Sequence, residues 1–363
     1  MSPLHIRAAG MVTAVGLDAA SSCAAMRGRL DGFGETRFLG PDGGWLIGAP
    51  VPLPRNWIGT KRLAHLAAGA IVEILRKVPE AETDAALILC LAEETRPGRP
   101  IPDAGAFAHQ LAGILDLPAT TKTHIIQHGR PSGFVALARA RRLLAAGEAR
   151  HVIIAGVDSY LTGPAVGHYL GKERLLVPGN ANGFIPGEAA AAVLCSLDTG
   201  PLVLTGLGLS REEAFLYNGL GEDGSHLPLR GDGMTAAYKA AMDEAKVDLA
   251  HIEYRISDLI GEQYWFKQTT LVSLRLERGR IPFQDLWSPG ENLGNIGAAV
   301  VPLMLGMALT AAEKGYDMGS PMLIEASGDD GACGACVLHA TTPTAPAYAR
   351  PQFSRAVDTV GGR

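Results

Sequence analysis

The stretch Gly183–Cys195, GFIPGEAAAAVLC, is the most specific guide to the fold. Its glycines and proline are typical of a turn, and the run that follows, residues 188–196, has the length and apolar character of a strand. Apolar runs of this length recur along the whole chain, and longer segments with helical spacing separate them. This alternation predicts an α/β protein built in layers.

We expect strands at residues 4–12, 85–92, 122–127, 151–157, 188–196, 202–208, 252–259, 321–327 and 333–339. We expect helices at residues 17–29, 60–77, 104–115, 132–146, 233–246, 266–278 and 296–314. The turn-rich stretch 209–232 separates two parts with a similar mixture of elements. After residue 341 the prolines and small residues predict an extended or loose tail.

Charge and composition exclude several classes of partner. The 363 residues carry a net charge of -5 at pH 7, and lysine and arginine are scattered, so we expect neither nucleic acid nor an anionic membrane as a partner. Five cysteines without regular spacing make no disulfide framework, which favours a reducing, cytoplasmic setting. The most apolar run, residues 296–312, is at the short limit for a membrane span, so we expect a buried helix there.

Four segments together carry a family resemblance: residues 132–159, 183–195, 291–309 and, more weakly, 324–339. They resemble the β-ketoacyl synthase branch of the thiolase-like superfamily, and the similarity covers roughly residues 4–340. The resemblance implies a duplicated, five-layer αβαβα fold, with one half at 1–208, the other at 209–341 and an extended or disordered tail at 342–363. It also implies a homodimer, or a heterodimer with a ketosynthase-like relative, formed through the strand near 151–157.

Catalysis in that family uses a cysteine at the amino end of a buried helix and two histidines, and all three positions differ here. The alignment places Arg130 at the cysteine, Asp258 at the first histidine and Asn295 at the second. A glycine-rich loop of the family matches Gly328, Asp329, Asp330 and Gly331. Arginine is not a nucleophile and asparagine cannot shuttle a proton. The resemblance therefore implies a degenerate site without catalytic residues.

A cation at a helix amino terminus meets the unfavourable end of the helix dipole, so Arg130 needs compensation. We expect Arg130 and Asp258 to form an ion pair that fills the former active site. Two alternatives remain open at this point. Arg130 extends from a loop into solvent, or its guanidinium binds an anionic ligand.

Three consecutive aromatic residues, Tyr264, Trp265 and Phe266, stand where the family has a small loop. They either plug the vacated acyl tunnel, which we favour, or face outward and anchor a protein partner. Cys333 and Cys336 have redox-motif spacing, but no second ligand pair accompanies them, so we expect core packing, no metal and no cofactor.

These features predict a catalytically inactive ketosynthase-like protein that acts as a binding or assembly module. The segments ISDLIGEQYWFK and ENLGNIGAA are similar to those of ketosynthase-like proteins associated with bacterial type VI secretion clusters. That similarity implies an adaptor or chaperone for an effector, with a protein client or an acyl carrier protein as partner. The alternative is an acyl-thioester transferase or decarboxylase that works without a cysteine, with Asn295 polarising the carbonyl.

Overall fold

The computed structural model describes residues 3–54, 56–118, 120–218, 226–277 and 284–341. Within them, a 10-stranded sheet runs in the order β10-β9-β11-β12-β8-β1-β7-β6-β4-β5. Its first five strands in chain order are β1 (Leu4–Val12), β4 (Ala85–Cys90), β5 (Thr123–Ile126), β6 (His151–Ser159) and β7 (Glu188–Ser196). The second five are β8 (Leu202–Arg211), β9 (Tyr254–Ser257), β10 (Asp285–Trp287), β11 (Met322–Ser327) and β12 (Ala332–Ala340).

The two sets of strands repeat one topology. In each set the first strand pairs antiparallel with the last, and the last pairs antiparallel with the fourth. The fourth strand then pairs parallel with the second, and the second with the third. A short antiparallel contact between β1 and β8, from Leu4↔Leu204 to Ile6↔Leu202, joins the sets. The sheet therefore has the duplicated arrangement that the sequence predicts.

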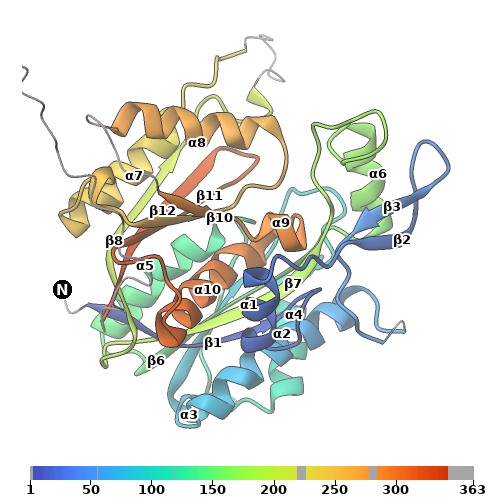
Figure 1. The fold of residues 1–363 in the computed structure, drawn as a ribbon. Coiled ribbons are helices and arrows are strands. Elements are labelled where there is room, and N and C mark those ends of the chain that lie inside the picture. Colours follow the sequence, from blue (N-terminus) through green and yellow to red (C-terminus); the bar gives the residue numbers. More distant parts are fainter. Residues whose placement is uncertain (1–2, 55, 119, 219–225, 278–283, 342–363) are drawn as a thin grey trace, which may run out of the picture.

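Helices form three further layers around the two sets of strands. Helices α5 (Ser132–Ala145) and α10 (Val300–Lys314) lie between the sets, as Figure 1 shows. Helices α2 (Gly59–Lys77) and α4 (Ala104–Leu115) cover the first set on its outer side, and α7 (Asp232–Ala245) and α8 (Gln263–Leu276) cover the second. This is the predicted five-layer order.

The two central helices pack so closely that one of them needs a glycine. A Cβ atom added at Gly133 of α5 would lie 2.5 Å from Val301 Cβ of α10.

Residues Gly297–Lys314 are the one described helical stretch long and apolar enough to cross a membrane, and 78% of it is buried inside the protein. The covering layers thus account for its apolar character.

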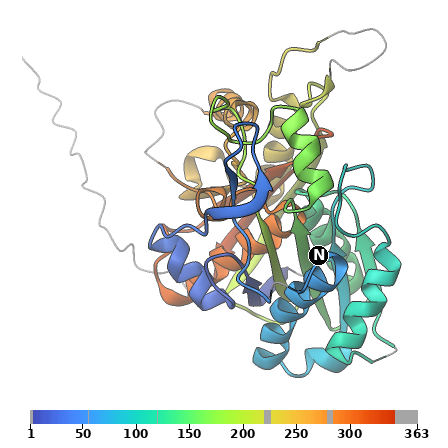
Figure 2. The ribbon, with the colours of Figure 1, turned by 90° about the vertical axis from the view of Figure 1, so that its right-hand side faces the viewer.

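Several short elements surround this framework: α1 (Ala19–Arg27), α3 (Ala81–Asp84), α6 (Gly163–Gly171), α9 (Gly290–Leu293), the 3₁₀ turns Leu249–His251 and Gly297–Ala299, and the hairpin of β2 (Gly34–Leu39) and β3 (Trp45–Gly48). Figure 2 shows the hairpin, in dark blue, beside α6, in green. Leu46 of the hairpin packs with Val166 and Tyr169 of α6 in one apolar cluster. The sequence analysis predicted neither the hairpin nor α6.

The predicted bounds of β1, β7 and α4 agree with the structure, and other elements differ in instructive ways. The helix predicted at 296–314 begins only at Val300, because a 3₁₀ turn at Gly297–Ala299 precedes it. Residue 208, where we expected the first half to end, lies inside β8. The predicted tail at 342–363 lies outside the described residues.

The prediction that a second chain associates through the strand near 151–157 is wrong. That strand, β6, is hydrogen-bonded to β4 on one side and to β7 on the other, and all nine of its residues are buried. Its backbone groups are already used, so it cannot accept another strand. Among the described strands, the edges of the large sheet are β5 and β10.

Candidate functional site

Arg130 lies in a tight turn directly before α5. Gly129 adopts a positive φ of 61°, and a Cβ atom there would lie 2.0 Å from Glu93 Oε1, so the turn requires glycine. Pro131 occupies the N-cap position without a side-chain hydrogen bond to the helix. The Ser132 hydroxyl accepts from the backbone N–H of His128 at 3.0 Å instead. The turn directs the Arg130 side chain inward, where the residue is 1% exposed.

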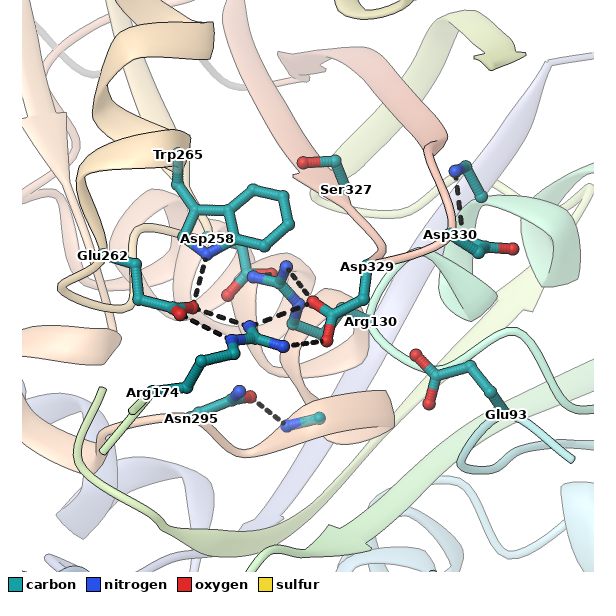
Figure 3. Close-up of polar contacts among 12 residues, drawn as sticks. Glu93, Arg130, Arg174, Asp258, Glu262, Trp265, Asn295, Ser327, Asp329 and Asp330 are labelled. Atoms are coloured by element: carbon teal, nitrogen blue, oxygen red, sulfur yellow. Dashed lines mark hydrogen bonds and ion pairs between the residues drawn. The ribbon is translucent and has the colours of Figure 1, made fainter. Parts of the chain in front are cut away.

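The Arg130 guanidinium meets two carboxylates from the second half of the chain (Figure 3). Its Nη1 lies 3.1 Å from Asp258 Oδ2, just after β9, and its Nη2 lies 3.5 Å from Asp329 Oδ1, in the β11–β12 turn. The side chains of Arg130 and Asp258 are 2% and 3% exposed. The structure therefore brings together the two residues for which we expected an ion pair, and Arg130 does not extend into solvent.

A second arginine extends the network beyond the predicted pair. Arg174, which follows α6, binds Glu262 through Nε at 2.6 Å and Nη2 at 2.7 Å. Its Nη1 lies 2.5 Å from Asp329 Oδ2 and donates to the Tyr217 hydroxyl at 2.6 Å. Asp329 thus bridges the two guanidinium groups. We call Arg130, Arg174, Asp258, Glu262 and Asp329 the buried ionic cluster.

The three consecutive aromatic residues have three different environments. Trp265 is 2% exposed, its ring centre lies 3.9 Å from Arg130 Cζ, and its Nε1 donates to Glu262 Oε2 at 3.0 Å. Tyr264 is partly buried, and its hydroxyl donates to the Ala214 carbonyl at 2.9 Å. Phe266 is 47% exposed. Trp265 therefore fills the space beside Arg130, whereas Phe266 faces solvent.

Asn295 does not join the buried ionic cluster. Its side-chain oxygen accepts from the backbone N–H of Gly297 at 3.0 Å, as Figure 3 shows, and its backbone N–H donates to the Ile185 carbonyl. The side chain thus stabilises the turn that precedes α10. Of the three positions where the family would carry catalytic residues, two meet in the cluster and the third supports the backbone.

The glycine loop also divides between two roles. Asp329 belongs to the cluster, while Asp330 accepts from the Ala332 backbone N–H at 3.0 Å and is exposed, so it fixes the turn. Gly331 has a φ of 91°, and a Cβ atom at Gly328 would lie 2.8 Å from Asp330 Oδ1. The loop therefore keeps its glycine geometry while it delivers a carboxylate to the two arginines.

Burial and charge act differently on the two aspartates. Burial raises the pKa of Asp258 to about 7, because the lost hydration outweighs the attraction of Arg130. Burial acts on Asp329 in the same direction, but Arg174 and Arg130 together hold its pKa below the usual value. With both arginines charged, three ionised carboxylates would leave one excess negative charge. A proton on Asp258 removes that excess.

A separate buried ion pair lies beside the cluster. Arg96 holds Asp158 through Nη1 at 2.7 Å and Nη2 at 2.5 Å, and its Cζ lies 4.2 Å from the Tyr160 ring centre. Asp158 Oδ2 also accepts from the Ala298 backbone N–H at 3.0 Å. This pair ties β6 to the turn before α10. Glu93, 3.9 Å from Arg96, is mostly buried, and burial raises its pKa.

No thiol lies at the amino end of α5. All five cysteines are buried, and burial raises the pKa of each thiol, to about 11 for Cys23 and about 12 for Cys336. Cys333 and Cys336 lie on β12 and form no disulfide. Among the described residues, no group of three or more His, Cys, Asp or Glu side chains is arranged to hold a metal ion. The charged side chains of the site pair with one another, and none of the five thiols is an activated nucleophile.

Arg174, Glu262 and Tyr217 were not predicted as site residues. Arg174 and Glu262 are 88 positions apart in the sequence; Arg174 lies outside the segments that carry the resemblance, and Glu262 lies in ISDLIGEQYWFK, where the resemblance assigns it no role. Only the fold places them together. Asp329, by contrast, had a sequence signal, because the glycine residues around it marked a loop near the former active site.

No family model matches the chain, and no curated protein sequence does so either. Solved structures match it over nearly its whole length. One is a ketosynthase in complex with its chain length factor from Xenorhabdus doucetiae (15% identity, 93% of this chain and 98% of that chain, TM-score 0.72). Another is a β-ketoacyl synthase from Burkholderia phymatum STM815 (16% identity, 94% and 100%, TM-score 0.68).

A third is a type II polyketide synthase acyl-carrier protein in complex with its ketosynthase (14% identity, 94% and 100%, TM-score 0.73). At these identities the similarity establishes the fold. The chain has the thiolase-like ketosynthase fold, as the sequence analysis predicted.

Proposed function

We propose that this chain is a ketosynthase-like protein that has lost its catalysis and acts as a binding or assembly module. One observation carries the proposal: the turn before the buried helix α5, where the family resemblance expects a nucleophilic cysteine, presents Arg130, and its guanidinium is paired with Asp258 at 3.1 Å. A guanidinium cannot attack a thioester. Its charge and the Trp265 ring occupy the space in front of the helix.

The helix amino terminus, which would otherwise hold an oxyanion, faces a cation that is already neutralised by carboxylates. An oxyanion site needs free N–H donors aimed at a vacant position. Here Asp329 supplies a negative charge at that end of α5, and Asp258 adds a second one above its pKa of about 7. The protein thus provides its own permanent anion in place of a transient one.

The test is incubation of the purified chain with malonyl and acyl thioesters of an acyl carrier protein, followed by mass spectrometry. We expect neither a covalent acyl adduct nor loss of carbon dioxide from the malonyl group. A catalytically active ketosynthase assayed in parallel shows that the thioesters are reactive. An acyl adduct on this chain, or thioester turnover that Asn295→Ala abolishes, would establish the acyltransferase or decarboxylase alternative.

The structure offers that alternative little support. Decarboxylation requires a donor that polarises the thioester carbonyl. The side-chain oxygen of Asn295 accepts from the backbone N–H of Gly297, so the side chain is held in the turn before α10 and could donate only through its amide nitrogen. The arginines of the cluster are donors, but their carboxylate partners already bind them.

We propose further that a second chain binds at the edge strand β5, as a second copy or as a ketosynthase-like relative. Among the described strands, β5 pairs with β4 alone and its other edge is unpaired; Ile125 is 38% exposed, and an unpaired edge can accept a strand. The chain length factor and acyl-carrier protein complexes among the similar structures favour partners of these classes. We propose a role as a cytoplasmic adaptor or chaperone in effector secretion on the sequence resemblance alone.

Sedimentation measurements on Ile125→Arg test the β5 proposal. A charge at the centre of the strand should convert an oligomer to a monomer, or should abolish capture of an added relative. Ile47→Arg is the matched control, because Ile47 is 41% exposed on a strand of the separate β2–β3 hairpin. Equal association of wild type and Ile125→Arg would remove β5 from consideration without affecting the proposal of lost catalysis.

A further inference from the structure

A cavity of about 620 Å³ opens between α1 and the carboxyl end of α10. It is lined by Ala20, Ala24 and Arg27 of α1 and by Gly28 directly after the helix, and on the other side by Thr310, Lys314 and Tyr316. The small side chains on α1 leave the space open. Its volume is within the range of small-molecule sites. None of these residues belongs to the buried ionic cluster.

Two exposed cations, Arg27 and Lys314, border this cavity, and the neighbouring Glu313 carboxylate attracts Lys314. Among the described residues, neither Arg27 nor Lys314 forms a hydrogen bond or ion pair through its side chain. The Arg27 guanidinium lies 4.4 Å from the centre of the Tyr316 ring, a contact with the ring face that uses none of its N–H donors. Both cations therefore have free hydrogen-bond donors beside an open, largely apolar space.

The helix dipole explains why cations are tolerated here, but it does not occupy their donors. Arg27 and Lys314 each lie in the last turn of their helix, where a positive charge is favourable. The hydroxyl of Thr310 donates to the Gly306 carbonyl at 2.8 Å, so it is not a free donor in the cavity. The donors for a ligand thus come from Arg27 and Lys314.

We propose that this cavity binds a small organic anion, in which a carboxylate or phosphate is attached to a short apolar body. The anionic group bridges Arg27 and Lys314, because a guanidinium fork and an ammonium both form charge-assisted hydrogen bonds with such oxygens. The apolar body lies against Ala20, Ala24 and the Tyr316 ring. This site is independent of the proposed loss of catalysis.

Isothermal titration calorimetry with phenyl phosphate, inorganic phosphate and benzyl alcohol tests the proposal. Phenyl phosphate combines both parts of the expected ligand, and each of the other two probes contains one. We expect phenyl phosphate to bind at least about tenfold more tightly than either. Arg27→Gln and Lys314→Gln should each weaken its binding by about tenfold, since each removes one charge-assisted contact.

Ala24→Trp tests the contribution of the cavity to binding independently of the charges of Arg27 and Lys314. The side chain of Ala24 is exposed, so tryptophan fills the space without unfolding the helix or removing a cation, and phenyl phosphate binding should be lost. Arg76→Gln is the matched control, because Arg76 is also an exposed cation in the last turn of a helix, α2. We expect this variant to bind as wild type does.

Three results would overturn the proposal: no phenyl phosphate binding by wild type, equal binding by Ala24→Trp, or an equal loss of affinity in Arg76→Gln and Arg27→Gln. Circular dichroism and the melting temperature of every variant show whether it is folded. The thioester assay is unaffected by any of these outcomes, so failure here leaves the proposed loss of catalysis standing.

Discussion

Replacing Arg130 by methionine should destabilise the protein by about 3–5 kcal/mol at pH 8, the usual cost of leaving a buried charge without its partner. The structure explains this magnitude. Among the described residues, the Asp258 carboxylate forms its only hydrogen bond with Arg130, and its side chain is 3% exposed. The Trp265 ring also loses the guanidinium that stacks on it. At pH 5.5 the loss should be smaller, because Asp258 then carries a proton and only Asp329 loses a charged partner.

Urea unfolding of wild type, Arg130→Met, Asp258→Leu and the double variant measures this coupling. The double variant should be more stable than Arg130→Met alone, because it removes both charges. Lys122→Met is the control: its ion pair with Glu148 spans 3.5 Å with both side chains at least half exposed, so the expected loss is below about 0.5 kcal/mol. Equal losses for Arg130→Met and Lys122→Met at pH 8 would refute the reasoning.

Three further predictions concern the same core. Because native Asp258 retains its proton up to pH about 7 and the unfolded residue only up to 3.8, the native state binds more protons in between. Wild type should therefore lose roughly 2–3 kcal/mol relative to Asp258→Asn as pH rises from 5 to 8, and a pH-independent difference in urea unfolding would contradict this. Trp265→Ala should cost about 3–5 kcal/mol and Phe266→Ala little, measured by thermal unfolding; similar losses would contradict the burial difference. Gly133→Ala should lower stability by about 1–3 kcal/mol because its Cβ meets Val301, whereas Gly113→Ala on the open face of α4 should raise it, and the order of melting temperatures decides.

The framework of the fold was predictable because its signals are local. Strand β7 has seven consecutive apolar residues, and β1 is mostly apolar although it includes His5 and Arg7, so their bounds follow from the sequence. The hairpin β2–β3 lacked such a signal, since exposed and covered residues alternate along short strands and Leu39, Trp45 and Ile47 are exposed. Its position depends on packing against α6, which only the tertiary structure provides.

The site was predictable only as far as a motif extended. Arg130 and Asp258 were found because the family pattern assigns a role to each position. Arg174 and Glu262 become site residues only when the fold pairs them with each other. The aromatic run shows another limit. Successive residues on a helix point about 100° apart, so Trp265 and Phe266 could not share one environment once α8 began at Gln263.

The repeated topology has a consequence for how the chain acquires its structure. In each half the first strand pairs with the last: β1 with β7, in which His5 lies opposite Ser196, and β8 with β12. During synthesis, β1 therefore cannot pair with β7 until nearly two hundred further residues have been added to the chain. Contacts of such long sequence separation slow folding and leave strands open to aggregation. This protein should depend on the order and pace of its translation more than its stability alone suggests.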